Sequence, residues 1–179
     1  GAGVAIPVFS LRSEESFGVG EFYDLKKMVD WARATGLKVI QILPINDTTM
    51  TGTWQDSYPY NANSTYALHP QFLRLEAVGR LSDKRAMAKY RKLGKELNAL
   101  PEVDYERVNT AKASYLKELF AEQGAATLAS EEFIEFFRSN ETWLRPYAAF
   151  CTLRDRHRTA DFSRWGKWAT YDSKAVGKL

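Results

Sequence analysis

The sequence predicts an α/β protein whose first part contains two parallel strands and whose remainder is helical. A helix lies between two short apolar segments before residue 46, which is the order of a right-handed β-α-β unit. No convincing strand follows Pro70, whereas apolar residues recur at helical spacing from residue 82 onward. Two strands cannot bury both faces of a parallel sheet. We therefore expect a piece of a larger α/β protein, with a helical subdomain inserted after the second strand.

The first strand is predicted at residues 4–9, a short apolar run in which Pro7 is unusual for a central strand. A polar loop follows, and it ends with Gly18 and Gly20. We interpret these glycines as part of a turn, because the third glycine of a dinucleotide-binding fingerprint is absent.

The helix between the strands is the most clearly marked element. Apolar residues recur at helical spacing in residues 22–35, and Gly36 occupies the position of a C-cap. Residues 38–44 form the second predicted strand and are rich in β-branched side chains. In parallel α/β folds the loops at the carboxyl ends of the strands carry the functional sites, so the segment after residue 44 is the place to look for one.

Four helices are predicted beyond Pro70, and caps and prolines indicate their ends. The first runs from Ser82 or Asp83 to Ala99, the second from about Asp104 to Gln123 with Gly124 after it, the third begins at Ser130, and the fourth begins near Arg145 with Pro146 in its first turn. Their aromatic stripes, including Phe120, Phe133, Phe136 and Phe137, are interpreted as core residues.

Composition excludes several classes of protein. Hydrophobic residues make up 45% and charged residues 26%, and the net charge of +3 is too small a surplus to indicate a nucleic-acid partner. The basic cluster at residues 154–158 is interpreted as a solvated helix end. A single cysteine, Cys151, allows no intrachain disulfide and favours a reducing compartment. No apolar run approaches the roughly 20 residues that span a bilayer, and no signal peptide is recognisable. We expect a soluble, cytoplasmic protein without a membrane partner.

The most unusual segment is residues 54–70, which combines aromatic rings with amides, hydroxyls and a carboxylate. Pro59 and Pro70 lack backbone donors, so the segment is neither helix nor ordinary strand. Flat rings beside hydrogen-bonding groups suit a sugar, which has an apolar C–H face and a rim of hydroxyls. A buried structural loop with tyrosines at its ends has a similar composition. The position of the segment after the second strand favours the binding loop.

Few residues qualify as catalytic or metal-binding candidates. His69 and His157 have no metal-ligand spacing, so no zinc site is expected. Cys151 lies on the apolar side of a helix and is interpreted as an inert core thiol. Asp47 and Asp56 lie in the right region for glycosidase chemistry, which needs two carboxylates, but nothing in the sequence pairs them. Asp56 is expected to accept hydrogen bonds from loop amides or from a sugar hydroxyl.

Several segments resemble the start of the catalytic domain of the 4-α-glucanotransferases, glycoside hydrolase family 77. They are AIPVFSLR at 5–12, SFGVGEF at 16–22, IQILPINDTT at 40–49 and DSYPY at 56–60. The resemblance covers about the first 75 residues closely, and WLRPYAAF at 143–150 is similar to the helical insertion of that family. It implies a partial (β/α)8 barrel, with the first β-α-β part and the loop in residues 1–75 and the inserted subdomain in residues 76–179.

The resemblance also implies an activity: transfer of α-1,4-glucan segments through a covalent enzyme intermediate, without a cofactor or metal. The catalytic carboxylates of that family come from later strands, so no catalytic residue is expected here and the fragment alone should be inactive. Tyr60 matches the tyrosine that lines the donor-side subsite, with Ser57 and Asp56 beside it as substrate-binding residues. Tyr58 is an insertion relative to the compact members of the family. The implied partners are an α-1,4-glucan or maltooligosaccharide and the remainder of the same domain.

Two other functions remain as alternatives. A non-catalytic starch- or maltooligosaccharide-binding module would also use an aromatic loop, and it should bind maltooligosaccharides tightly by itself. A nucleotide-binding α/β domain is disfavoured, because the sequence has no phosphate-binding loop.

Overall fold

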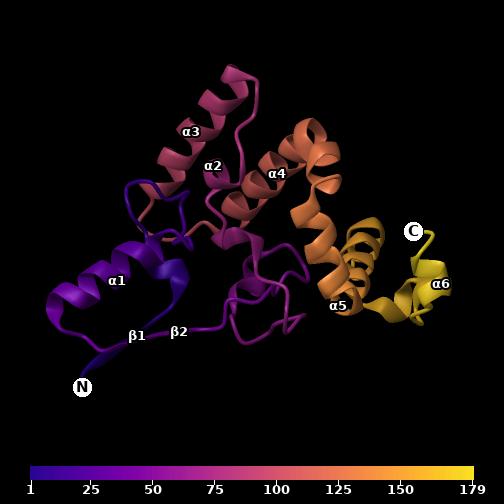
Figure 1. Cartoon of the computed structure of the whole chain (residues 1–179), viewed down its shortest axis with the longest axis horizontal. Coiled ribbons are helices and arrows are strands. Elements are labelled where there is room, and N and C mark those ends of the chain that lie inside the picture. The colour runs from indigo at the N-terminus through magenta and orange to yellow at the C-terminus, as the bar shows by residue number, and fades with distance from the viewer. The chain divides into compact units, whose positions relative to one another are not determined.

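The computed structural model describes residues 1–179, and Figure 1 shows the course of the chain and its helices. The chain divides into two compact units. Unit 1 comprises Gly1–Ile45 and His69–Ala125, and unit 2 comprises Asn46–Leu68 and Ala126–Leu179. Each unit thus combines two stretches that are far apart in the sequence. The family-based division at residue 75 stays a prediction.

The start of unit 1 is the predicted β-α-β unit. Strands β1 (Gly3–Ile6) and β2 (Val39–Ile42) are parallel neighbours, in a register that places Gly3 opposite Val39. Helix α1 (Asp24–Thr35) connects them, and Gly36 adopts the predicted left-handed C-cap conformation with φ 77°. The prediction of a strand through residue 9 is wrong. β1 ends before Pro7, which has no N–H to donate, and Val8–Ser10 form a 3-10 helix.

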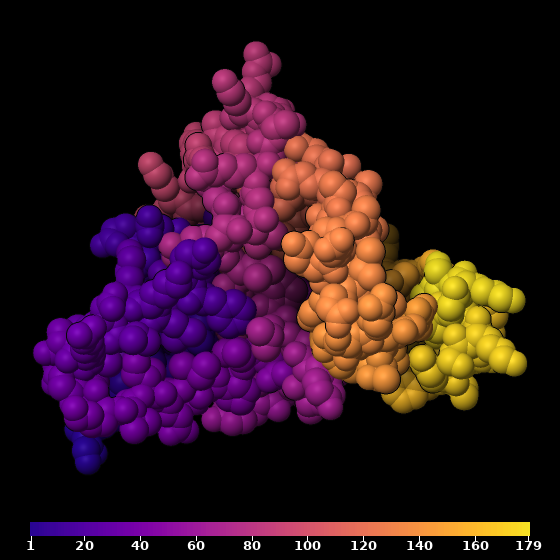
Figure 2. Space-filling model, in the orientation of Figure 1, coloured from indigo at the N-terminus to yellow at the C-terminus, as the bar shows by residue number.

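The two-stranded sheet has no buried residue. Residues along both strands alternate between exposed and half-buried, and Val39 is 61% exposed. Trp31 and Val29 of α1 are also exposed. The N-terminal stretch that contains β1 and α1 is the indigo-to-purple part of the surface in Figure 2. Within unit 1, therefore, neither strand has the cover that a parallel sheet normally has on both faces.

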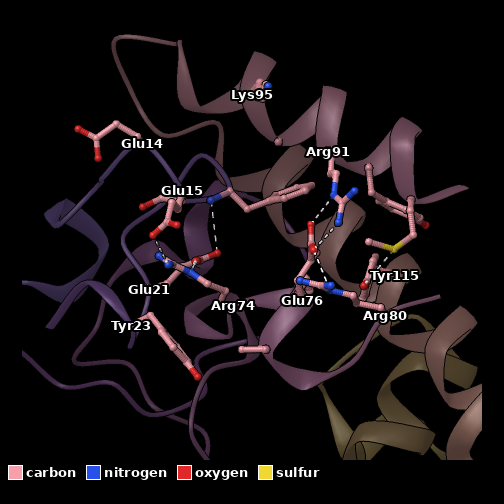
Figure 3. Close-up of a pocket in the computed structure, with 17 residues that line it drawn as sticks. Glu14, Glu15, Glu21, Tyr23, Arg74, Glu76, Arg80, Arg91, Lys95 and Tyr115 are labelled. Carbon is pink, nitrogen blue, oxygen red and sulfur yellow. Dashed lines mark hydrogen bonds and ion pairs between the residues drawn. The ribbon is translucent and has the colours of Figure 1, made fainter. Parts of the chain in front are cut away.

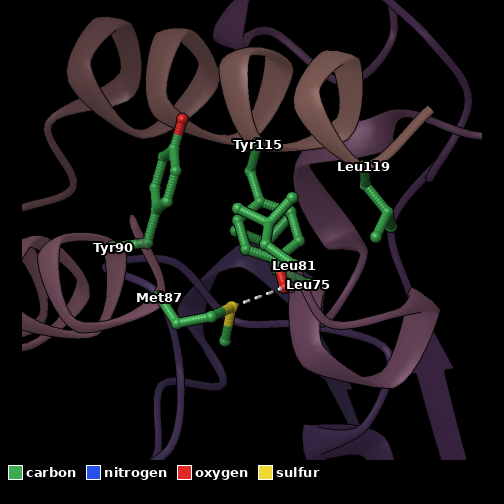
Figure 4. Close-up of a cluster of buried hydrophobic side chains, with 6 residues drawn as sticks. All are labelled: Leu75, Leu81, Met87, Tyr90, Tyr115 and Leu119. Atoms are coloured by element: carbon green, nitrogen blue, oxygen red, sulfur yellow. Dashed lines mark hydrogen bonds between the residues drawn. The ribbon is translucent and has the colours of Figure 1, made fainter. Parts of the chain in front are cut away.

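The main hydrophobic core of unit 1 lies among its three remaining helices, α2 (Leu75–Val78), α3 (Lys84–Asn98) and α4 (Tyr105–Leu128). Figure 4 shows its six buried side chains, which are Leu75, Leu81, Met87, Tyr90, Tyr115 and Leu119. The predicted helix starting at Ser82 or Asp83 is confirmed, since Asp83 caps α3 by accepting a hydrogen bond from the Arg85 N–H.

Helix α4 is longer than predicted. It passes through Gly124 to Leu128 instead of ending at Gln123. The missing side chain of Gly124 makes room for the ring of Phe120, which a Cβ atom at Gly124 would approach to 2.7 Å. Phe120 itself is 59% exposed, so its assignment to the core is wrong.

Helix α5 (Glu131–His157) is one continuous helix where two were predicted. Ser130 caps it as expected, with its hydroxyl oxygen accepting from the Phe133 N–H at 3.2 Å. Pro146 lies inside the helix and does not start a new one; its ring removes one backbone donor, which a long helix with tertiary contacts tolerates. The expected core position of Phe136 is also wrong, because its side chain is exposed. A short helix, α6 (Ser173–Val176), follows.

None of these helices combines the length and apolar character needed to cross a bilayer.

Candidate functional site

Most of the aromatic segment lies in a loop of unit 2, residues 46–68, which is closed at its base; His69 and Pro70 belong to unit 1. Asn46 and Leu68 form an antiparallel bridge, and the Asp47 N–H donates to the Ala67 carbonyl at 2.9 Å. The two ends of the loop are therefore held together.

Asp56 organises the tip of this loop. Its side chain is buried, with the residue 3% exposed. Its carboxylate accepts hydrogen bonds from the backbone N–H groups of Met50, Thr51 and Gly52 at 3.0, 2.9 and 2.7 Å, and from the Thr51 hydroxyl at 3.0 Å. The expectation that Asp56 accepts from loop amides is confirmed. Its direct contact with a sugar stays a prediction.

Asp47 performs a similar role at the base. The residue is 2% exposed. One carboxylate oxygen accepts from the N–H and hydroxyl of Thr49 at 3.0 and 2.6 Å, and the other accepts from the Tyr147 hydroxyl at 2.7 Å and the Asn63 amide at 3.3 Å. Asp47 and Asp56 thus have separate sets of donors, and both carboxylates are already engaged inside the protein.

One face of α5 supports the loop. Tyr147 donates to Asp47, and the Arg154 guanidinium donates to the Thr49 carbonyl at 2.7 Å. The rings of Trp143 and Tyr66 are stacked, with centroids 5.5 Å apart and an interplanar angle of 15°. Residues 143, 147 and 154 share a helix face because they are spaced by four and seven positions. The basic cluster does lie at the end of α5 with residues 155–158 exposed, as interpreted, but the interpretation is wrong for Arg154, which contacts the loop.

The loop directs its rings outward. Trp54, Tyr58, Tyr60 and Tyr66 are each between 60% and 67% exposed, and the rings of Tyr58 and Tyr60 are 5.6 Å apart. Ser57 is exposed as well. A buried structural loop would enclose its tyrosines, so this geometry favours a binding surface over that alternative. The polar groups that fix the loop point inward and the apolar rings face solvent.

The remaining candidates have structural surroundings. His69 is buried, and one of its ring nitrogens lies 2.9 Å from the Tyr105 hydroxyl. Burial raises the pKa of Cys151 above its usual value, which keeps it a thiol, as the interpretation of an inert side chain requires. No group of three or more His, Cys, Asp or Glu side chains in the structure could hold a metal ion.

Unit 1 contains a cavity of about 610 Å³, shown in Figure 3. Several of its charged side chains are paired with one another. Arg91 holds Glu76 through two hydrogen bonds of 2.7 Å, and Arg74 pairs with Glu15 at 3.1 Å and Glu21 at 2.8 Å. These ion pairs connect different segments of unit 1, so we assign them a structural role.

Replacing Tyr147 with phenylalanine tests the support that α5 gives to the loop. The change removes one of the hydrogen bonds that Asp47 accepts, and we expect unit 2 to lose about 1–2 kcal/mol of its free energy of unfolding. Urea denaturation followed by circular dichroism measures this loss. Tyr171→Phe is the control, because Tyr171 is exposed. An equal, small effect of both changes would contradict the role of Tyr147.

The Tyr147 hydroxyl also makes the free energy of unfolding of unit 2 depend on pH. Burial, followed by the hydrogen bond to Asp47, raises the pKa of Tyr147 well above its ordinary value. Its stabilising contribution is therefore complete below about pH 10, where the unfolded phenol begins to ionise, and is lost as the pH rises further. Tyr147→Phe should lose less stability than the unchanged chain over that alkaline range.

Neither local periodicity nor motif spacing indicated the roles of Trp143, Tyr147 and Arg154. The sequence separation between Tyr147 and Asp47 is 100 residues, and an aromatic residue on a helix is equally consistent with a core position. Only the similarity of residues 143–150 to a known family marked this segment.

Comparison with known proteins identifies the relatives of this chain. A family model described as 4-alpha-glucanotransferase matches residues 6–179. The rice 4-alpha-glucanotransferase DPE2 (Oryza sativa subsp. japonica) is 45% identical over an alignment of 184 residues. The alignment covers 100% of this chain and 19% of that protein. The 4-alpha-glucanotransferase of Chlamydia caviae is 38% identical over 92% of this chain and 30% of its own length. The corresponding enzyme of Chlamydia muridarum is 36% identical over 91% of this chain and 30% of its own length.

The chain thus spans about a fifth to a third of these relatives. The matches nevertheless extend over nearly all of its own residues; the family model includes α1, β2 and α5, and the match to the rice protein covers the whole chain. This chain belongs to glycoside hydrolase family 77, the family of the 4-alpha-glucanotransferases.

Proposed function

We propose that this chain is part of a 4-α-glucanotransferase that moves α-1,4-glucan segments between maltooligosaccharides by a retaining, covalent mechanism. The observation that carries the proposal is the loop at residues 46–68, which presents exposed aromatic rings on a backbone fixed by buried aspartates. The names of the relatives supply the reaction. In this proposal the chain contributes contacts to the donor glucan and works without a cofactor.

Tyr60, Ser57 and Asp56 have different parts in this contact. The exposed ring of Tyr60 offers a flat apolar face for the C–H side of a glucose unit, and the exposed Ser57 hydroxyl can bond a sugar hydroxyl. Asp56 is next to Ser57 and fixes the backbone on which both lie. We assign Asp56 to the substrate-binding set chiefly through this positioning.

The chain should be inactive alone. A retaining mechanism requires a carboxylate nucleophile and an acid/base about 5–5.5 Å apart, both able to reach the scissile bond. The loop carboxylates Asp47 and Asp56 are buried and occupied by internal donors. Side chains that only bind substrate cannot replace a missing nucleophile.

For the fold, we propose that β1 and β2 are the first two strands of a (β/α)8 barrel, within residues 1–75, and that residues 76–179 are a helical insertion. The exposure of Val39 and Trp31 supports this, because further strands and helices of a barrel would cover them. The remainder of the same domain is then the principal partner of the chain. The single cysteine is consistent with the reducing cytoplasm as its compartment.

Incubation with maltotriose tests the proposed function. We expect the chain alone to release no glucose and form no longer oligomers, as judged by chromatography. Adding the separately expressed remainder of the domain should restore transfer, and Tyr60→Ala should weaken the restored activity mainly through KM. A product ladder from the chain alone would contradict the proposal. Tight binding of maltooligosaccharides by the chain, without restored transfer, would instead support a non-catalytic binding module, which the exposed rings would also suit.

A further inference from the structure

We propose that a groove in unit 2, separate from the ring of Tyr60, is a second contact site for the α-glucan chain. The groove has a volume of about 450 Å³ and lies between residues 62–65 of the loop and one face of α5. Its volume falls within the range of small-molecule sites. The inference takes its ligand class from the proposed function, but its residues are different.

The α5 side of the groove is apolar and fixed in place. Trp143, Pro146 and Phe150 line it at intervals of three and four residues, which places them on one helix face. The Trp143 indole stacks on Tyr66 and donates to the Asn140 side chain at 2.9 Å. The Phe150 ring packs against Trp165 at 5.6 Å. Rings that are already ordered lose little further freedom when a sugar stacks on them.

The loop side supplies both kinds of hydrogen-bonding group. The Asn63 amide nitrogen donates to the Thr49 carbonyl at 3.0 Å and to Asp47 at 3.3 Å. Rotating the amide would place its oxygen against these acceptors, so its orientation is fixed, and the oxygen is buried without a partner. Ser64 Oγ accepts from the N–H groups of Tyr66 and Ala67, which leaves its O–H free to donate.

The groove selects against charged ligands. None of its eight lining residues carries a charge; they are Ala62, Asn63, Ser64, Thr65, Trp143, Pro146, Tyr147 and Phe150. An anion would find no cation among these lining residues, and a metal or amine would find no carboxylate among them. Aromatic faces beside neutral donors and acceptors match an uncharged polyhydroxyl chain, and in this family that chain is an α-1,4-glucan.

A nuclear magnetic resonance titration of the whole chain with maltoheptaose tests the site. The indole N–H signal of Trp143, assigned by its loss in Trp143→Phe, should shift progressively, whereas the signal of Trp31 in unit 1 should not. Trp143→Leu and Phe150→Leu should each weaken the fitted Kd by about fivefold to tenfold. Trp31→Leu is the matched control, because Trp31 is an exposed tryptophan on another helix. Cellohexaose, a β-linked glucan, should bind more weakly than maltoheptaose.

The outcomes separate this inference from the proposed function. Weaker binding by Tyr60→Ala with an unchanged Kd for Trp143→Leu and Phe150→Leu would overturn the groove and support the Tyr60 contact. Weaker binding by Trp143→Leu and Phe150→Leu with an unchanged Kd for Tyr60→Ala would support the groove and exclude Tyr60 from the glucan-binding residues. If no indole signal responds to maltoheptaose, the inference is wrong. If Trp143 responds only to the added remainder of the domain, the inference is also wrong and the groove is a protein contact.

Discussion

Replacing Lys112 with alanine is expected to lower the free energy of unfolding of unit 1 by about 3–5 kcal/mol. Lys112 and Glu21 are each 1% exposed. The Lys112 ammonium donates to the Glu21 carboxylate at 2.7 Å and to the carbonyls of Gln71 and Leu73 at 2.6 and 2.8 Å. Its removal leaves three acceptors short of a donor, and Glu21 keeps only the ion pair with Arg74 and the hydrogen bond from the Phe17 N–H.

Urea denaturation followed by far-UV circular dichroism measures this effect. Lys117→Ala is the matched control, since Lys117 is an exposed lysine on the same helix, α4, and should change stability by less than about 0.5 kcal/mol. Burial lowers the pKa of Lys112, which reflects the cost of enclosing its charge. If Lys112→Ala unfolds at the same urea concentration as the unchanged chain, the ion pair contributes no net stability and the expectation fails.

The parts of the fold that the sequence predicted correctly have local signals. Helix α1 could be predicted because its apolar spacing and the glycine at position 36 lie within a few turns of each other. Pro146 shows the limit of such signals. A proline favours a first-turn position, but here the contacts of Trp143, Tyr147 and Arg154 with the loop span it and hold α5 as one helix.

The candidate site also combines features that the sequence predicts with features that it does not. The rings and amides of residues 54–70 identified the loop by composition, and the hydrogen bonds that Asp56 receives from residues 50–52 are local enough to be expected. The groove beside Trp143 and the ion pair between Lys112 and Glu21 depend on residues that are distant in sequence; the two charged residues are 91 positions apart. No spacing rule relates such positions, because the fold alone brings them together.

Replacing Asp56 with alanine should have the second large effect, a loss of about 2–4 kcal/mol from the free energy of unfolding of unit 2. The backbone N–H groups of Met50, Thr51 and Gly52 would lose a charged acceptor at once. Asp56→Asn keeps one acceptor oxygen and should lose about half as much. Glu132→Ala is the control, because Glu132 is an exposed carboxylate in the same unit. Urea denaturation of each variant provides the measurement.

Comparison with Tyr60→Ala then separates positioning from direct contact. Tyr60 is exposed, so its loss should weaken glucan binding and leave the free energy of unfolding nearly unchanged. Asp56→Ala should reduce both together, because the ring of Tyr60 depends on the backbone that Asp56 fixes. If Asp56→Ala weakens glucan binding while the stability of unit 2 is retained, Asp56 must contact the sugar itself. Asp56 would then be a residue that binds the glucan directly, and not only one that fixes the backbone of the loop.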